Sequence, residues 1–325
     1  MVLSRRTALS CLPLLGLPWA VLAQNAASYP NKPVRIVPFG TGGGPIDSLA
    51  RAYADKLAQR FGQNMVVDPK PGASGIIAAD FVAKSAPDGY TVMMTMPLTH
   101  VNNAILMKLP YDPIKDFTPL TMVATGGPML VARADAPFND VQGLIAYAKQ
   151  RKQPMNYGTW GNGSAAHLFG ELLKQQTGTD LVHVAYKSEA AAHIDLFGQL
   201  LDFAWANPSS ARTHTQAGKM KVLGIAGTRR VSIMPQVSTF SEQGYKGFDV
   251  DSWVGLYGPA HLPPEIQNTL VQALREITQM PDIQSRLTSF GFEPLGNTPD
   301  QFSAVVKNDT PRVAALIKAA GVTAP

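Results

Sequence analysis

The sequence is almost free of cysteine: Cys11 is the only one among 325 residues. It lies within the first 23 residues, for which we predict removal on export, so the mature chain would contain no thiol. Disulfides, thiol catalysis and cysteine-ligated metal sites are thereby excluded. The six histidines show no spacing typical of metal ligands, and we expect neither a metal nor a cofactor.

Charged residues are also few, at 16% of the chain against 45% hydrophobic residues. This balance excludes an intrinsically disordered chain and indicates a globular protein, and the length favours two lobes. The formal net charge is +5, but the lysine and arginine residues are scattered and form no basic stripe. We therefore predict no nucleic-acid binding.

An uncharged and mostly apolar run, Thr7–Ala23, follows Arg5 and Arg6. It is shorter than the roughly 20 residues that a membrane-spanning helix needs, and prolines interrupt it. Its last residues, Val21-Leu22-Ala23, are small or apolar, as signal peptidase requires. The sequence therefore predicts a signal peptide over residues 1–23, removed after Ala23, and leaves open whether export uses the general or the twin-arginine route.

Short β-branched runs alternate with helical patterns along the mature chain. The run Val34–Val37 precedes a glycine-rich loop and then a helical stripe of apolar residues over Asp47–Phe61, which Gly62 should end. The other strands and helices predicted in this way span residues 65–67, 76–84, 90–94, 141–150, 155–157, 165–176, 181–185 and 301–320. This alternation predicts an α/β fold in which each lobe is a mainly parallel sheet flanked by helices.

Two extended runs, Leu120–Thr125 and Val250–Leu256, each lead into glycine and proline residues. We interpret them as hinge crossings between the lobes. Residues 24–125 and 250–325 would then form lobe one, and residues 126–249 would form lobe two. Lobes joined in this way can close on a ligand like a clamshell.

Two glycine-rich loops stand where a predicted strand meets a predicted helix. In the first, Phe39–Asp47, consecutive glycines would expose N–H groups at a helix N-terminus, which favours an anion. Pro45 and the absence of Gly-Lys-Ser/Thr exclude a dinucleotide fingerprint and a phosphate-binding P-loop. The second loop, Tyr157–His167, has the same design in the other lobe. We predict one carboxylate-accepting loop in each lobe, with a tight turn that binds nothing as the alternative for the first.

The loops Lys70–Gly75 and Pro97–Asn103 follow further strands of lobe one and should line the same edge of the cleft. Motifs of hydrolytic enzymes are missing, because neither Ser74 nor Ser164 has the two flanking glycines of a nucleophile elbow. The sequence therefore favours a binding protein over an enzyme.

Two acidic residues could be taken for an acid/base pair. Asp195 and Asp202 lie in the predicted helical segment 194–202, near Glu189. Helix capping and solvation explain such carboxylates more simply than catalysis does.

Several short segments recur in the order expected of one known family. They are Tyr29–Val37, Gly42–Asp47, Leu49–Arg51, Pro71–Gly75, Asp88–Thr91, Thr99, His100, Asn102, Tyr157–Leu168 and Ala217–Lys219. Together they resemble the extracytoplasmic solute-binding receptors of tripartite tricarboxylate transporters, the Bug family. The resemblance covers essentially all of the mature chain. The chain departs from the family over Ser188–Ala192, where glycine-rich spacing would be expected.

The resemblance implies a monomeric, periplasmic two-lobed binding protein that captures a small carboxylate and delivers it to membrane permease subunits. The ligand would be a di- or tricarboxylate, an acidic amino acid or an aromatic acid. The ligand-binding residues that the resemblance and the loops indicate are Gly42, Gly43, Gly44, Asp47, Ser74, Thr99, His100, Trp160, Gly161, Asn162, Gly163, Ser164, His167 and Tyr186. Phe39, Trp160 and Trp253 either form an apolar wall of the site or belong to the core. A secreted α/β hydrolase and a sensor that feeds a signalling system remain as alternatives.

Overall fold

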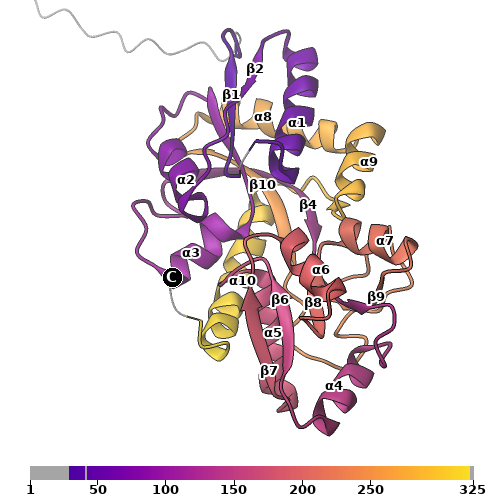
Figure 1. Ribbon diagram of the computed structural model, residues 1–325. Coiled ribbons are helices and arrows are strands. Elements are labelled where there is room, and N and C mark those ends of the chain that lie inside the picture. Colours follow the sequence, from indigo (N-terminus) through magenta and orange to yellow (C-terminus); the bar gives the residue numbers. More distant parts are fainter. Residues whose placement is uncertain (1–28, 41, 323–325) are drawn as a thin grey trace, which may run out of the picture.

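The computed structural model describes residues 29–40 and 42–322 (Figure 1). The predicted signal peptide, residues 1–23, lies outside the described residues, so it stays a prediction. Within the described ranges, no helix has the length and apolar character needed to cross a bilayer.

Two sheets organise the described residues, one of six strands and one of five. The strands of the first, in spatial order, are β11 (Glu293–Pro294), β4 (Phe117–Gly126), β10 (Ser252–Pro259), β3 (Thr91–Thr95), β1 (Val34–Pro38) and β2 (Met65–Val67). Those of the second are β7 (Leu181–Ala185), β6 (Met155–Thr159), β8 (Phe203–Ala206), β5 (Met129–Arg133) and β9 (Met220–Ile225).

Helices flank both sheets, as Figure 1 shows. The helices associated with the six-stranded sheet are α1 (Pro45–Phe61), α2 (Ile76–Ala83), α3 (Asn103–Leu106), α8 (Pro264–Thr278), α9 (Pro281–Ser289) and α10 (Pro299–Ala319), with the short turns η2 (Ala73–Gly75) and η3 (Leu98–Asn102). Those of the five-stranded sheet are α4 (Val141–Gln150), α5 (Ala165–Thr177), α6 (Glu189–Phe197) and α7 (Pro208–Gln216).

The predicted α/β class with helix-flanked sheets is confirmed, and both sheets are mixed, with antiparallel as well as parallel strand pairs. In the six-stranded sheet, β10 runs antiparallel to both β3 and β4, and β11 runs antiparallel to β4. In the five-stranded sheet, β5 runs antiparallel to β8 and β9. The remaining pairs are parallel. Strand β1 pairs in this way with both β2 and β3, and strand β6 does so with both β7 and β8.

The two extended runs interpreted as crossings are the neighbouring strands β4 and β10. They pair with Trp253 opposite Thr125, so the chain leaves and re-enters the six-stranded sheet side by side. Where the lobes hinge, and the division of the chain at residues 126 and 250, stay predictions. Helix α10 packs on both β4 and α5 and thus ties the two sheets together.

Helix α1 illustrates how the sequence specifies an element. Pro45 occupies its first turn, and Leu49, Tyr53 and Leu57 form the predicted buried stripe. Gly62 ends the helix in the left-handed region, at φ 64°, and its N–H donates to the carbonyl of Ala58. Glycine adopts this conformation without the steric cost that a Cβ brings, so the helix stops where the sequence predicts.

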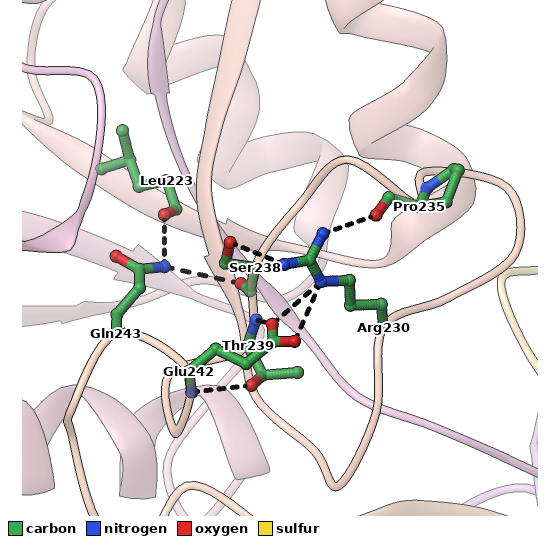
Figure 2. Close-up of polar contacts among 7 residues, drawn as sticks. All are labelled: Leu223, Arg230, Pro235, Ser238, Thr239, Glu242 and Gln243. Atoms are coloured by element: carbon green, nitrogen blue, oxygen red, sulfur yellow. Dashed lines mark hydrogen bonds and ion pairs between the residues drawn. The ribbon is translucent and has the colours of Figure 1, made fainter.

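The long segment between β9 and β10 is held by side-chain contacts (Figure 2). Arg230 forms an ion pair with Glu242, with Nε and Oε2 2.9 Å apart, and also donates to the carbonyl of Pro235. Gln243 donates to the carbonyl of Leu223 on β9 at 2.9 Å. The contacts of Arg230 hold the segment together, and the bond from Gln243 fastens it to the five-stranded sheet before the chain returns to β10.

Candidate functional site

A cavity of about 500 Å³ lies between loops of the two sheets. Loops that follow strands of the six-stranded sheet meet the starts of α5, α6 and α7, which follow strands of the five-stranded sheet. The two sides touch, because the Asn102 side chain on η3 donates to the carbonyl of Gly163 at 3.4 Å. A cleft between two lobes, at the ends of their strands, is a common place for a small-molecule site.

Most of the cavity lining is apolar. Aromatic rings come from both sides, and α10 adds aliphatic side chains. The apolar lining residues include Phe39, Met96, Leu98, Trp160, Leu168, Phe169, Phe290, Phe292, Val313 and Leu316. Such a lining suits a ligand whose body is hydrocarbon and whose polar groups are few.

The N-terminus of α5 supplies hydrogen-bond donors at this cavity. Ser164 caps the helix: its hydroxyl oxygen accepts the N–H of His167 at 3.3 Å, while the hydroxyl donates to the carbonyl of Gly161 at 2.7 Å. Backbone hydrogen bonding of α5 begins at Leu168, whose N–H donates to the carbonyl of Ser164.

Ala165 and Ala166 precede that first helical bond, so their N–H groups have no partner within the helix. Ala165 lines the cavity together with Asn162 and Ser164. The helix dipole adds partial positive charge at this end. The arrangement can therefore accept an anion such as a carboxylate.

His167 shapes the loop ahead of α5. Gly163 has a φ of 71°, and its N–H donates to Nδ1 of His167 at 3.1 Å. The His167 ring stacks on that of His183, with centroids 3.8 Å apart. Burial lowers the pKa of both rings, that of His183 to about 4, so both imidazoles are neutral near pH 7. His167 lies outside the cavity lining and holds the loop from behind.

In the first glycine-rich loop, a backbone N–H group donates to a side chain of the protein itself. The N–H of Gly43 donates to Oδ2 of Asp47 at 2.8 Å. Arg51 approaches both carboxylate oxygens of Asp47, at 3.0 and 3.1 Å. Burial alone would raise the pKa of Asp47, but the hydrogen bonds from Arg51 and Gly43 outweigh it and hold that pKa below its usual value.

Gly42, Gly43, Gly44 and Asp47 are absent from the residues that line the cavity. Their contact with a ligand stays a prediction. It would require the loop to move or the bond from Gly43 to Asp47 to break.

Three further predicted residues lie away from the cavity. His100 is 2% exposed, stacks on Tyr257 with centroids 4.1 Å apart, and has Nδ1 2.8 Å from the hydroxyl oxygen of Thr99. Burial lowers the pKa of His100 to about 3. The Tyr186 hydroxyl donates to Asp195 at 2.6 Å. These contacts are structural, and a ligand contact at these positions stays a prediction.

Of the predicted ligand-binding residues, the structure gathers Ser74, Trp160, Asn162 and Ser164 around the cavity. Gly161 and Gly163 shape the loop that presents them. Of the three aromatic residues considered for an apolar wall, Phe39 and Trp160 line the cavity, whereas Trp253, 1% exposed, packs against Phe302 in the core.

Sequence reasoning missed several lining residues, among them Glu189, Asn207, Asp251, Phe290 and Phe292. Asn207 stands directly before Pro208, a helix-start pattern that could have marked another loop at the same edge. The segment around Phe290 carries no local signal, because its place at the cavity depends on distant contacts, among them the pairing of β11 with β4 and the packing of α9 on α1 and α8.

Two of these residues are acidic. Glu189 begins α6 with its side chain 16% exposed, and it accepts the backbone N–H of Asn207 at 3.0 Å and also the Asn207 side-chain amide. Asp251 accepts the N–H and the hydroxyl of Thr228, each at 2.7 Å. Within the described ranges, no three histidine, cysteine, aspartate or glutamate residues are grouped so as to hold a metal ion.

Comparison with known proteins shows a matching family and similar proteins. Residues 49–322 match the family model described as tripartite tricarboxylate transporter family receptor. The protein BugT of Bordetella pertussis is 31% identical over 301 residues, which cover 91% of this chain and 92% of BugT.

Two solved structures are similar throughout. The periplasmic binding protein BugD is 33% identical with a TM-score of 0.76, and the match covers 91% of this chain and 99% of BugD. The R. palustris protein Rpa4515, solved with adipate, is 32% identical with a TM-score of 0.79, over 91% of this chain and 99% of that protein. The two-lobed architecture of a periplasmic binding protein, predicted from the sequence, is confirmed.

Proposed function

The chain belongs to the tripartite tricarboxylate transporter receptor family, and on this premise we propose that it captures a small carboxylate in the periplasm and delivers it to membrane permease subunits. The observation that carries the proposal is the free N-terminus of α5 at an apolar cavity. The N–H groups of Ala165 and Ala166 would bind the carboxylate, and Asn162 and Trp160 would contact the rest of the ligand. The similar protein Rpa4515 was solved with the carboxylate adipate.

Ligand capture would involve closure of the two lobes. We propose that residues 126–249 move as one lobe against residues 24–125 and 250–325. The cavity has walls from both, so a ligand that contacts both walls would favour the closed form by its extra contacts there. The protein would act as a monomer, exported with removal of residues 1–23.

Catalysis has less support than binding. The family is one of receptors. The hydroxyl of Ser164 donates to the carbonyl of Gly161, and Nδ1 of His167 accepts from Gly163. Neither group is arranged as the serine and the base of a hydrolase, in which the hydroxyl donates to the imidazole.

A ligand screen tests the proposal. Mono-, di- and tricarboxylates, acidic amino acids and aromatic acids would be compared by thermal shift, and hits measured by calorimetric titration. A ligand at 100 times its dissociation constant should stabilise the folded protein by about 2.7 kcal/mol. The proposal predicts saturable binding of at least one acid, whereas a folded protein that binds none at millimolar concentration would contradict it.

A further inference from the structure

The polar groups of the cavity are of two opposite kinds. The start of α5 offers N–H donors, which attract negative charge. The start of α6 and the segment before β10 instead present the carboxylates of Glu189 and Asp251. A ligand that fills the cavity must satisfy both kinds of group.

Nothing in the described lining neutralises these carboxylates. Lysine, arginine and histidine are all absent from the lining residues that the structure describes. The imidazole of His193 lies 3.8 Å from Glu189, but burial lowers the pKa of His193 to about 4, so the ring is uncharged near pH 7. Burial also raises the pKa of Glu189, although hydrogen bonds from Asn207 and Ser210 oppose the shift.

Both carboxylates keep capacity to accept further hydrogen bonds. Asn207 gives one donor to each oxygen of Glu189, and Thr228 gives one to each oxygen of Asp251. A carboxylate has about four acceptor sites in all. Each oxygen of Asp251 therefore has an unused site, and Glu189, to which Ser210 also donates, keeps about one.

From this geometry we propose that the ligand carries one carboxylate, bound at α5, and a hydrogen-bond donor, an amide or ammonium group, that binds Glu189. The inference rests on the proposed function and narrows its ligand class. A second ligand carboxylate at Glu189 would place two like charges together in a largely apolar cavity with no cation between them, which disfavours binding. An amide N–H there would gain a hydrogen bond to a charged acceptor.

Matched ligands distinguish a second carboxylate from an amide group at Glu189. Each diacid would be compared with its own monoamide, which has nearly the same shape: succinate with succinamate, adipate with adipamate, and terephthalate with 4-carbamoylbenzoate. Calorimetric titration of the wild-type protein should show that, on the skeleton that binds best, the monoamide binds at least about tenfold more tightly than the diacid, as loss of a hydrogen bond to a charged group would cost.

Two variants test whether Glu189 causes the preference for the monoamide. Glu189→Gln keeps an acceptor for the N–H of Asn207 and removes the charge, so the preference for the monoamide should shrink to about threefold or less. Glu265→Gln removes a carboxylate from the exposed first turn of α8, which does not line the cavity, and should leave the preference unchanged. Circular dichroism would establish that both variants are folded.

Different results would contradict the preference for a monoamide and the proposed carboxylate receptor. A wild-type protein that binds diacids as tightly as their monoamides would overturn the inference and leave the carboxylate receptor standing. Preference for the monoamide that persists in folded Glu189→Gln would also overturn it. Failure to bind any acid of the matched set or of the wider screen would contradict both proposals. The wild-type comparison decides the inference even if Glu189→Gln does not fold.

Discussion

Replacing Ala165 by proline removes one donor from the proposed carboxylate site without removing a bond from the fold. Ala165 is the first residue of α5, and its N–H has no helical partner. Proline is favoured at this position, and α1, α7, α8, α9 and α10 of this protein already begin with it. The residue before it, Ser164, has φ −65° and ψ 155°, an extended conformation that proline accepts in its predecessor.

We expect Ala165→Pro to weaken binding of the ligand. A lost hydrogen bond to a charged group costs about 1.5 to 3 kcal/mol, which is an affinity loss of about 10-fold to 150-fold at 1.4 kcal/mol per decade. Calorimetric titration with the tightest-binding acid of the screen measures it, and urea unfolding should show a stability change of less than about 1 kcal/mol, since no helical bond is removed.

Ala165→Val is the matched control, because it adds similar bulk and keeps the N–H. It should bind the acid far more tightly than Ala165→Pro does. Unchanged affinity in a folded Ala165→Pro protein would refute the assignment of this N–H to the ligand. Equal losses in both variants would also refute it, because bulk alone would then explain the effect.

Four further expectations follow from the same contacts. Ser164→Ala should lower stability by about 0.5 to 2 kcal/mol through loss of the α5 cap, measured by thermal unfolding, while affinity falls by less than in Ala165→Pro. The pKa of Asp47 is lowered in the folded state, so its carboxylate stabilises the fold above its unfolded pKa of about 3.9 and that contribution is lost as the pH falls below this value. Urea unfolding should therefore show Asp47→Asn to be clearly less stable than wild type at pH 7, with a smaller difference at pH 3. Small-angle scattering should give a smaller radius of gyration when ligand is bound, and an unchanged profile would count against lobe closure. Intact-mass measurement of the exported protein should show an N-terminus at Gln24.

Much of the fold could be predicted because its elements are specified locally. The helix predicted over Asp47–Phe61 is α1, and the strand predicted at residues 181–185 is β7 without a shift. The final helix was expected over residues 301–320 and spans Pro299–Ala319. Apolar periodicity and residues such as Gly62 carry this information within a few positions along the chain.

Strand direction was harder to predict, because it depends on distant pairing. The antiparallel course of β10 follows from its place between β3 and β4, whereas an extended apolar run reads the same in either direction. The same limit applies to Phe290 and Phe292, whose place at the cavity depends on distant contacts such as the pairing of β11 with β4.

The candidate site was predicted in part. The β6–α5 loop was found because glycines, a serine able to cap and a helix start stand together in sequence, and Ser164 is the residue that caps α5. The internal bond from Gly43 to Asp47 could have been anticipated, since an acidic residue at the third helical position often reaches back to an N–H before the helix. The place of Glu189 at the cavity could not be anticipated, because its hydrogen-bond partner Asn207 is 18 residues away along the chain, beyond β8.

A crystal structure with the tightest-binding acid of the screen tests the central claim most directly. The account predicts the acid in the cavity between the sheets, with carboxylate oxygens about 3 Å from the backbone nitrogens of Ala165 and Ala166 and its apolar body against Trp160. An acid bound outside this cavity, or one inside it whose carboxylate contacts neither nitrogen, would contradict the account.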